Sequence, residues 1–410
     1  MATLAVPGSA AKKAAKRSLW WRVHQWAGLQ VSLFLAFILA TGTIATLSHE
    51  IDWLINPAMR VASQEGPQAS WGALVTSAHE VAGDARIEWI YAPTEPWFAV
   101  EAIAERPNGD RFRIQIDPWT AEVRGLTSWF NAQRLFRELH RNLMMPTAIG
   151  VPIVTALAFP LLASVVTAFW VYKKWWRGFF RLPRRRKDRR NDGRRFTGDL
   201  HRFVGLWSLW FVALIGVTGV WYFVEKMGGA APVPRPPEVL APAQASGAKL
   251  DALVTKAHQA FPDLRVTSIG FPKGQPGGVV VMGQAKALLV RERANAVMLD
   301  PDRQVVVEVV HGEELSLHQR ISEAADPLHF GTWGGLATRI AWFLCGLALT
   351  GLAVTGVLIY ALRLRQEAAA DRKNGGVLAA MWRGMGVMAW PSLIFLILAF
   401  ALIPTKLTGE

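Results

Sequence analysis

Two stretches of apolar sequence carry the same pattern of residues. Residues 24–42 read HQWAGLQVSLFLAFILATG, and residues 201–219 read HRFVGLWSLWFVALIGVTG. Each begins with a histidine, has Gly-Leu four residues later and ends in Thr-Gly, so that histidine and final glycine are 18 residues apart. Histidine is rare and costly inside a membrane and is usually functional there. The pattern predicts two related membrane helices, each with a histidine near one end.

The composition is that of a membrane protein. The chain has 410 residues, 51% of them hydrophobic and 19% charged, with a mean hydropathy of +0.21, whereas soluble domains carry about 25% charged residues. The single cysteine, Cys345, excludes a disulfide framework, a cysteine-rich zinc site, a cysteine-ligated iron–sulfur cluster and covalent c-type haem. No G-x-G-x-x-G motif marks a nicotinamide or flavin domain.

Five segments are long and apolar enough to cross a bilayer, which takes about 20 residues. They are residues 20–48, 147–172, 202–224, 336–361 and 384–404. The first is too long for a removed signal peptide and lacks a small-residue cleavage site. Three prolines, Pro146, Pro152 and Pro160, predict bends in the second.

Basic residues give the expected orientation. The net charge of +14 is concentrated in the N-terminus 1–19 and in the loops 173–197 and 362–383, and residues 173–195 hold twelve Lys and Arg against two Asp. If the spans alternate, these three segments share one side, which the positive-inside bias makes cytoplasmic. The C-terminus and two long segments, 50–140 and 226–330, then lie outside. Contact with anionic lipid explains the basic loop better than binding of nucleic acid.

The two outside segments also resemble each other. The sequence ALVTSAH at 73–79 recurs as ALVTKAH at 252–258, with six identities in seven. Alternating runs such as RFRIQIDP and ANAVMLDP predict strands, and each copy is expected to end its last strand at Asp-Pro, at residues 117–118 and 300–301. Each segment predicts one α+β module of about 60 residues.

The repeats together predict an α-helical membrane protein. It has five transmembrane helices, a duplicated four-helix core with a pseudo-twofold axis along the membrane normal, and two small α+β periplasmic modules.

Four of the nine histidines occupy matching positions in the two halves. Symmetry places His24 opposite His201 near the cytoplasmic side and His140 opposite His329 near the outer side. Two imidazoles on facing helices are the ligands of six-coordinate haem b. For any single one of these histidines the alternative is an interfacial ring with one wet edge. The sequence therefore predicts two haems b, with His49 as a reserve ligand for the outer one.

Four further residues are candidates for haem contact. Gly28 and Gly205 lie one turn after their histidines and provide room for a porphyrin or, alternatively, close helix packing. Arg141 and Arg202 follow candidate ligands and can pair with haem propionates or extend to lipid phosphate. No H-x-x-x-H or H-E-x-x-H motif favours a site for a bare metal ion.

Several motifs resemble those of the PepSY-associated transmembrane family. They are WRVHQWAGL at 21–29, DPWTAEV at 117–123, LHRNL at 139–143, DLHRFVGLW at 199–207, DPDRQVV at 300–306 and PLHFGTWGG at 327–335. Within the family, the chain is most similar to inner-membrane ferrisiderophore reductases of the FoxB type. The resemblance implies a bacterial inner-membrane protein with two haems that reduces ferric siderophore in the periplasm and releases Fe(II). It carries the ligand role onto His24, His140, His201 and His329.

The expected activity is that of a haem-dependent oxidoreductase, a ferric-siderophore reductase. Its electron donor is a cytoplasmic reductase or membrane quinol, and its chemistry needs no protein acid or base, so no catalytic residue is assigned. One alternative is a membrane-anchored PepSY binding or regulatory protein without haem. Another is a siderophore or iron permease, for which the spans offer few polar side chains.

Overall fold

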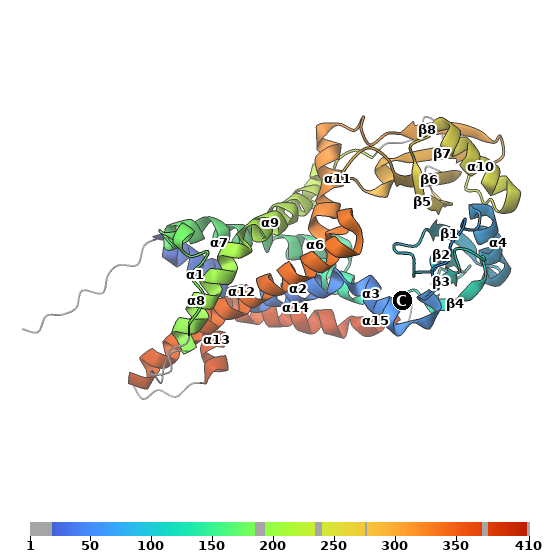
Figure 1. Ribbon diagram of the computed structural model, residues 1–410. Helices are drawn as coiled ribbons and strands as arrows, with labels where there is room; N and C mark the ends of the chain where they lie inside the picture. The colour runs from blue at the N-terminus through green and yellow to red at the C-terminus, as the bar shows by residue number, and fades with distance from the viewer. Residues whose placement is uncertain (1–18, 185–192, 234–239, 275–276, 371–375, 408–410) are drawn as a thin grey trace, which may run out of the picture.

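The structure, a computed structural model, describes residues 19–184, 193–233, 240–274, 277–370 and 376–407. A long helical region ends in a β-sheet domain (Figure 1). Nearly all of the predicted basic N-terminus 1–19 lies outside the described residues, as do the middle of the loop 173–197 and part of the loop 362–383.

The described residues include four helical segments long and apolar enough to cross a membrane. These are Thr147–Val171, Leu209–Gly229, Thr332–Arg363 and Val377–Leu407. A bent pair of helices near the N-terminus makes a fifth candidate. The chain is therefore a membrane protein with four or five spans.

The helices of the membrane region pack along one another in pairs. They are α1 (Leu19–Leu29), α2 (Ser32–Ala45), α6 (Thr147–Thr155), α7 (Ala158–Val171), α8 (Gly193–Trp207), α9 (Leu209–Val224), α12 (Gly335–Ala370), α13 (Val377–Met385), α14 (Ala389–Ala401) and α15 (Ile403–Leu407). α1 packs along α7, α8 along α12, α2 along α12, and α7 along α9. Their shared core includes Phe34, Leu161, Phe211 and Leu349.

Residues 20–48, predicted as one continuous span, form two helices instead. α1 and α2 meet at an angle of 61° across residues 30–31. α1 follows α7, whereas α2 follows α12 and α14, so the bend lets each half pack on its own neighbours. The second span is interrupted at residues 156–157, because Pro160 has no N–H to bond the carbonyl of Ala156.

Other helices continue past the predicted ends of their spans. α8 begins at Gly193, inside the predicted loop 173–197, and α12 runs to Ala370, inside the predicted loop 362–383. The early turns of α8 are charged, and Asp199 pairs there with Arg202 at 2.5 Å, three residues along the same face. Hydropathy marks the apolar part of a helix that lies in the bilayer, not its polar extensions. The apolar pattern therefore could not predict where α8 begins and α12 ends.

The two outside segments form one continuous antiparallel sheet rather than two separate modules (Figure 1). Its strand order is β4-β3-β2-β1-β5-β6-β7-β8. The strands are β1 (Arg86–Tyr91), β2 (Val100–Glu105), β3 (Arg111–Ile116), β4 (Val123–Ser128), β5 (Arg265–Gly270), β6 (Val279–Gln284), β7 (Ala296–Asp300) and β8 (Val305–Val310). β1 and β5 pair at the centre, where Trp89 lies opposite Gly270. A Cβ at Gly270 would lie 2.3 Å from the Trp89 ring, so the joint requires glycine.

Two helices pack on each other and on the sheet, α4 (Trp71–Ala82) and α10 (Gly247–Ala260). The Gly72 amide donates to Asp251 Oδ1 at 2.8 Å, and a Cβ at Gly72 would lie 2.1 Å from the Gly247 carbonyl oxygen. Val75 and Leu253 are buried in a core that continues through both halves of the sheet. The two halves therefore share one hydrophobic core.

The Asp-Pro pairs lie within each half and do not end its last strand, contrary to expectation. β4 follows the first pair and β8 follows the second. Asp117 Oδ1 accepts hydrogen bonds from the amides two and three residues further on, at 2.9 and 3.2 Å. Asp300 Oδ1 makes the same two bonds at 2.8 and 3.0 Å. An aspartate that accepts in this way forms a turn, and here the turn joins β3 to β4 and β7 to β8.

Three helices connect the sheet to the membrane region: α3 (Ser48–Ile55), α5 (Ala132–Asn142) and α11 (Leu317–Phe330). Asp52 on α3 caps α5 by accepting from the amides of Ala132 and Gln133 at 2.8 and 2.9 Å. Arg339 at the start of α12 pairs with Glu95 of the sheet domain at 2.9 Å. Asp52 thus joins α5 to α3, and Arg339 joins α12 to the sheet domain.

Candidate functional site

His24 on α1 and His201 on α8 face the same internal space. Nδ1 of His24 lies 3.1 Å from the Ser164 carbonyl oxygen and 3.0 Å from the Thr167 hydroxyl, both on α7. Nδ1 of His201 lies 2.9 Å from the Thr355 hydroxyl on α12. Each ring is thus anchored to the helix that packs along its own.

A cavity of about 510 Å³ lies between these helices. Pockets that hold cofactors measure about 300–1,000 Å³. Its wall is largely apolar. The aromatic and polar side chains in the wall are Trp21, His24, Gln25, Ser164, Phe169, Tyr172, Trp175, Arg194, His201, Arg202, Tyr360 and Arg363. The cavity therefore suits a largely apolar ligand of cofactor size, with arginines in its wall for acidic groups.

Gly28 and Gly205 both line this cavity. A Cβ at Gly28 would meet no heavy atom within 4 Å, and one at Gly205 would meet only Leu352 Cδ2, at 3.6 Å. Close helix packing was the alternative role for both glycines. No neighbouring helix packs on Gly28, and only an ordinary contact with Leu352 is made at Gly205. The two positions instead leave room beside the histidines.

The two candidate arginines lie in different surroundings. Arg202 lines the cavity, but its guanidinium already pairs with Asp199 at 2.5 Å. Arg141 is exposed on α5, and neither an ion pair nor a side-chain hydrogen bond joins it to any other described residue. Arg194 and Arg363, which the sequence did not single out, also line the cavity.

His140 on α5 and His329 on α11 form a second pair. Their ring centroids are 6.1 Å apart and their planes are inclined by 38°. Two imidazoles that bind opposite sides of one metal ion, each at about 2 Å, have centroids about 6 Å apart. Burial lowers the pKa of His140, and burial together with His140 lowers the pKa of His329 to about 3. Both rings are therefore neutral at pH 7, as ligation requires.

His140 packs against the middle of α2 rather than its end. Its Nδ1–H donates to the Ile38 carbonyl at 2.8 Å, and a Cβ at Gly42 would lie 2.6 Å from its Cε1. A straight helix would rise about 20 Å from His24 to Ile38, against about 35 Å to the end of the predicted span, and the 61° bend between α1 and α2 shortens the distance further. The two histidine pairs are thus closer together than a full span.

All four rings are held in the same tautomer. His24 and His140 face carbonyl oxygens, which can only accept, so Nδ1 must carry the proton. Thr218 holds Nδ1 of His329 at 2.7 Å, and its own proton goes to the Leu214 carbonyl. The Thr355 proton likewise goes to the Gly351 carbonyl. Nε2 therefore keeps its lone pair in every ring, and no described residue hydrogen-bonds to it.

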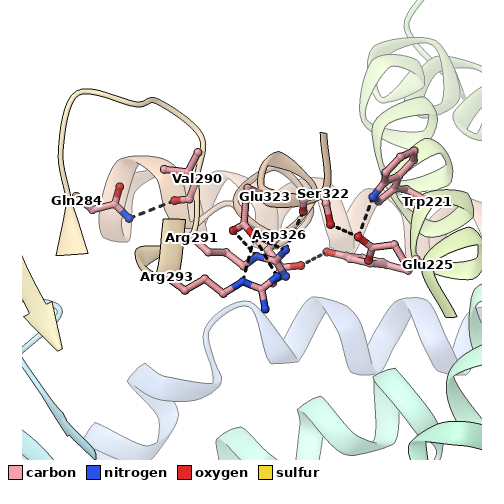
Figure 2. Close-up of polar contacts among 10 residues, drawn as sticks. Trp221, Glu225, Gln284, Val290, Arg291, Arg293, Ser322, Glu323 and Asp326 are labelled. Atoms are coloured by element: carbon pink, nitrogen blue, oxygen red, sulfur yellow. Dashed lines mark hydrogen bonds and ion pairs between the residues drawn. The ribbon is translucent and has the colours of Figure 1, made fainter. Parts of the chain in front are cut away.

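A charged network of Arg291, Arg293, Glu323 and Asp326 (Figure 2) joins α11, the helix that carries His329, to the sheet domain. The Tyr222 ring centroid lies 5.3 Å from that of His329, and its hydroxyl donates to Asp326 Oδ1 at 2.7 Å. Arg291, just before β7, binds Asp326 at 3.2 Å and Glu323 at 2.8 Å. The network ties α9 and α11 to the sheet domain and fixes the helix that carries His329.

The other histidines lie outside both pairs. His49 stacks on Phe98 with centroids 4.7 Å apart, and its buried Nδ1 has no hydrogen-bond partner among the described residues. Its place as a reserve ligand is thus not supported, because the structure gives His140 a different neighbour. The remaining four histidines join neither pair. His311 packs on Phe261, and His318 contacts the Gly229 carbonyl. His79 and His258 lie on α4 and α10, where His258 is exposed. In the described ranges no three His, Cys, Asp or Glu group closely enough to hold a bare metal ion.

The residues that anchor the rings were not singled out from the sequence. Thr167 and Thr355 each lie five residues before a tyrosine, Tyr172 and Tyr360, and both tyrosines line the cavity. This repeated Thr-to-Tyr spacing could have identified Thr167 and Thr355 as equivalent residues of the two halves. Thr218 belongs to the repeated Thr-Gly pair, which marked it without revealing its contact.

A search of curated proteins found no match to the chain. The family model for the PepSY-associated TM region matches residues 21–363, which include both histidine pairs and the whole sheet. The chain therefore belongs to the family of the PepSY-associated TM region.

Proposed function

We propose that the chain is a di-haem oxidoreductase of the bacterial inner membrane that reduces ferric siderophores on the side of the sheet. One observation carries this proposal. Four imidazoles lie as two pairs, one lining a shared cavity and the other with ring centroids 6.1 Å apart. Each ring has its Nδ1–H engaged and its Nε2 unpartnered among the described residues. Imidazoles held at Nδ1 are typical metal ligands, and a pair of them on facing helices suits haem b.

The inner haem would be held by His24 and His201 and the outer haem by His140 and His329. The inner cavity offers fitting volume, aromatic walls and arginines for the propionates. The outer pair offers fitting ring separation. Bound haem would supply one-electron exchange at its iron.

The chain's own residues tune and protect these sites. The hydrogen bonds at Nδ1 fix the ring orientation and raise the basicity of Nε2. The apolar wall, with Leu161 and Val212, limits water at the inner site. Asp326 and Tyr222 hold the outer site against the sheet domain. None of these roles requires an acid or base catalyst.

The arrangement also supports a duplicated core and the predicted orientation. α1 on α7 and α8 on α12 are equivalent packings, each with a threonine anchoring the histidine of the partner helix. The sheet lies at one end of the helices, and the start of α8 and the adjoining α13 lie at the other (Figure 1). Because the basic segments belong to that second end, it faces the cytoplasm and the sheet faces the periplasm.

The substrate is Fe(III) in a siderophore, which gains one electron. Hard oxygen donors hold Fe(II) less tightly than Fe(III), so reduction releases the iron. The electron comes from a cytoplasmic reductase or from membrane quinol, because the chain has no nicotinamide or flavin motif of its own. Lipid is the only other partner required, and nucleic acid is not one.

Anaerobic reoxidation tests this function. Full-length protein is reduced with dithionite, desalted and mixed with ferric citrate or ferrioxamine B, while a ferrous chelator traps Fe(II). We expect oxidation of the haems with one Fe(II) formed per electron, and no oxidation by the iron-free siderophore. Absence of oxidation by any ferric chelate would contradict the proposed reductase activity.

A further inference from the structure

α5 carries three arginines that have no anionic partner in the described part of the chain. Arg134, Arg137 and Arg141 make neither a salt bridge nor a side-chain hydrogen bond there. Their spacing of three and four residues places them on one face of the helix. Four other arginines at the sheet end, by contrast, have acidic partners. These pairs are Arg111–Glu88 at 2.7 Å, Arg113–Glu101 at 3.0 Å, Arg291–Glu323 at 2.8 Å and Arg339–Glu95 at 2.9 Å.

This arginine face (Arg134, Arg137 and Arg141) extends from the sheet to the outer histidine pair. At one end, the Arg134 guanidinium lies 3.6 Å from the centroid of the Trp129 ring, next to β4. At the other end, Arg141 directly follows His140. The side chain of Arg137, between them, is exposed to solvent. The face is thus a row of cations that ends beside a candidate haem ligand.

The positive charges of this face are crowded. Trp129 also has the Arg113 and Arg111 guanidiniums 5.0 and 5.6 Å from its ring centroid. Burial lowers the pKa of Arg134 to about 10, and the charges of Arg113 and Arg137 act in the same direction. Cations held together at this cost favour an anion that relieves their repulsion.

Nearby acids do not neutralise the face. Glu138 and Asp326 act on Arg137 through their charges only, without a direct ion pair. Asp326 is already bound by Arg291 at 3.2 Å and by the Tyr222 hydroxyl at 2.7 Å. A ligand with several carboxylates would supply the missing charge and match the planar donors of arginine.

We propose that the arginine face of α5 binds ferric chelates of net negative charge, carboxylate siderophores in particular, and holds them beside His140. That the bound anion is a ferric chelate rests on the proposed function, whereas the binding of a carboxylate-rich anion does not. Trp129 stacks on the Arg134 guanidinium, and Arg137 and Arg141 supply exposed charges. Neutral or cationic hydroxamate chelates would gain little from this surface.

Equilibrium dialysis with redox-inert gallium(III) citrate tests the proposal without any electron transfer. Full-length protein is placed in nanodiscs of zwitterionic lipid. We expect salt-sensitive binding that weakens about tenfold in Arg137→Gln, as for loss of one charge-assisted hydrogen bond. Arg137→Lys, which keeps the positive charge, should retain most of the affinity for gallium citrate. The matched control is Arg265→Gln, which removes an exposed arginine of β5 and should leave binding unchanged.

Three results would overturn the proposal. The first is absence of gallium citrate binding, or equal binding by Arg137→Gln and the unaltered protein. The second is equal affinity for the cationic gallium complex of desferrioxamine B. The third is loss of binding when phosphatidylglycerol is added to the nanodiscs, which would assign the face to lipid phosphate. A colourless protein that still binds gallium citrate through Arg137 would refute the haem function and leave the anion site standing.

Discussion

The imidazoles of His140 and His329 lie with their ring centroids 6.1 Å apart, although 189 residues separate them in the chain. Each comes from a short helix between the sheet domain and a membrane span. His140 is fixed by the Ile38 carbonyl and His329 by the Thr218 hydroxyl. The structure thus brings together two residues that the sequence paired only through the symmetry of its repeats.

Thr355→Val removes the hydrogen bond that the structure gives to His201 Nδ1. Loss of such a partner weakens metal binding by about 10- to 100-fold. Thr167→Val is the matched control, because His24 keeps the Ser164 carbonyl at 3.1 Å. Haem titration should therefore show a large loss of haem affinity in Thr355→Val and a small loss in Thr167→Val. Equal losses would contradict the anchoring role of these bonds.

Gly42→Ala places a methyl group where the His140 ring lies, 2.6 Å from Cε1. Overpacking of this kind costs about 1–3 kcal/mol, and the ring must move away from the Ile38 carbonyl. We expect a lower melting temperature together with loss or spectral change of the outer haem alone. Gly351→Ala on α12, where a Cβ meets nothing within 4 Å, should change neither. An unaltered outer haem in Gly42→Ala would show that this contact does not set the ring.

Acidification should destabilise the protein through His49. Burial lowers its pKa to about 4 in the folded state, below the value of about 6.5 in an unfolded chain. Between these values the unfolded state binds more protons, so stability is lost as pH falls from about 6.5 to about 4, by about 2 kcal/mol for this half-buried ring. Thermal melts should show this loss reduced in His49→Phe, which keeps the stack on Phe98.

The control for that pH series is His258→Gln, at an exposed position on α10. It should follow the pH dependence of the unaltered protein. If His49→Phe follows it too, the neutral buried state of His49 does not contribute to stability.

Gly270→Ala should open the joint between the two halves of the sheet. A Cβ there would lie 2.3 Å from the Trp89 ring, at a cost of about 1–3 kcal/mol. Hydrogen exchange should quicken at the Phe271 amide, which bonds the Glu88 carbonyl across the joint at 2.8 Å. Gly274→Ala, at an exposed position without neighbours within 4 Å, should leave exchange unchanged. Equal protection in both variants would mean that the halves are held by α4 and α10 alone.

Much of this architecture follows from local sequence patterns. The apolar segments located the spans, and the repeated His-Gly-Thr-Gly spacing paired the helices, because both depend on residues close together in the chain. The joint between β1 and β5 was not predicted. The strand pattern of each repeat is the same whether or not the other repeat is present, so it carries no information on their pairing. Only the packed structure shows that Trp89 covers Gly270. Two separate modules would each have left an unpaired edge strand. Because exposed edge strands are usually covered in native proteins, this favoured pairing between the modules.

The bend at residues 30–31 was missed for a similar reason. Hydropathy is uniform across it, and the bend arises because α1 and α2 pack on different helices. The anchors of the rings were missed because a threonine on an apolar helix usually bonds its own backbone. Thr218 and Thr355 do so and also accept from a histidine.

The reduced-minus-oxidised visible spectrum of the purified protein tests the central claim most directly. The account predicts sharp b-type bands with two haems per chain. It also predicts that His24→Ala and His201→Ala each remove the same haem while His140→Ala and His329→Ala each remove the other. A colourless protein, or the loss of different haems within one pair, would contradict it.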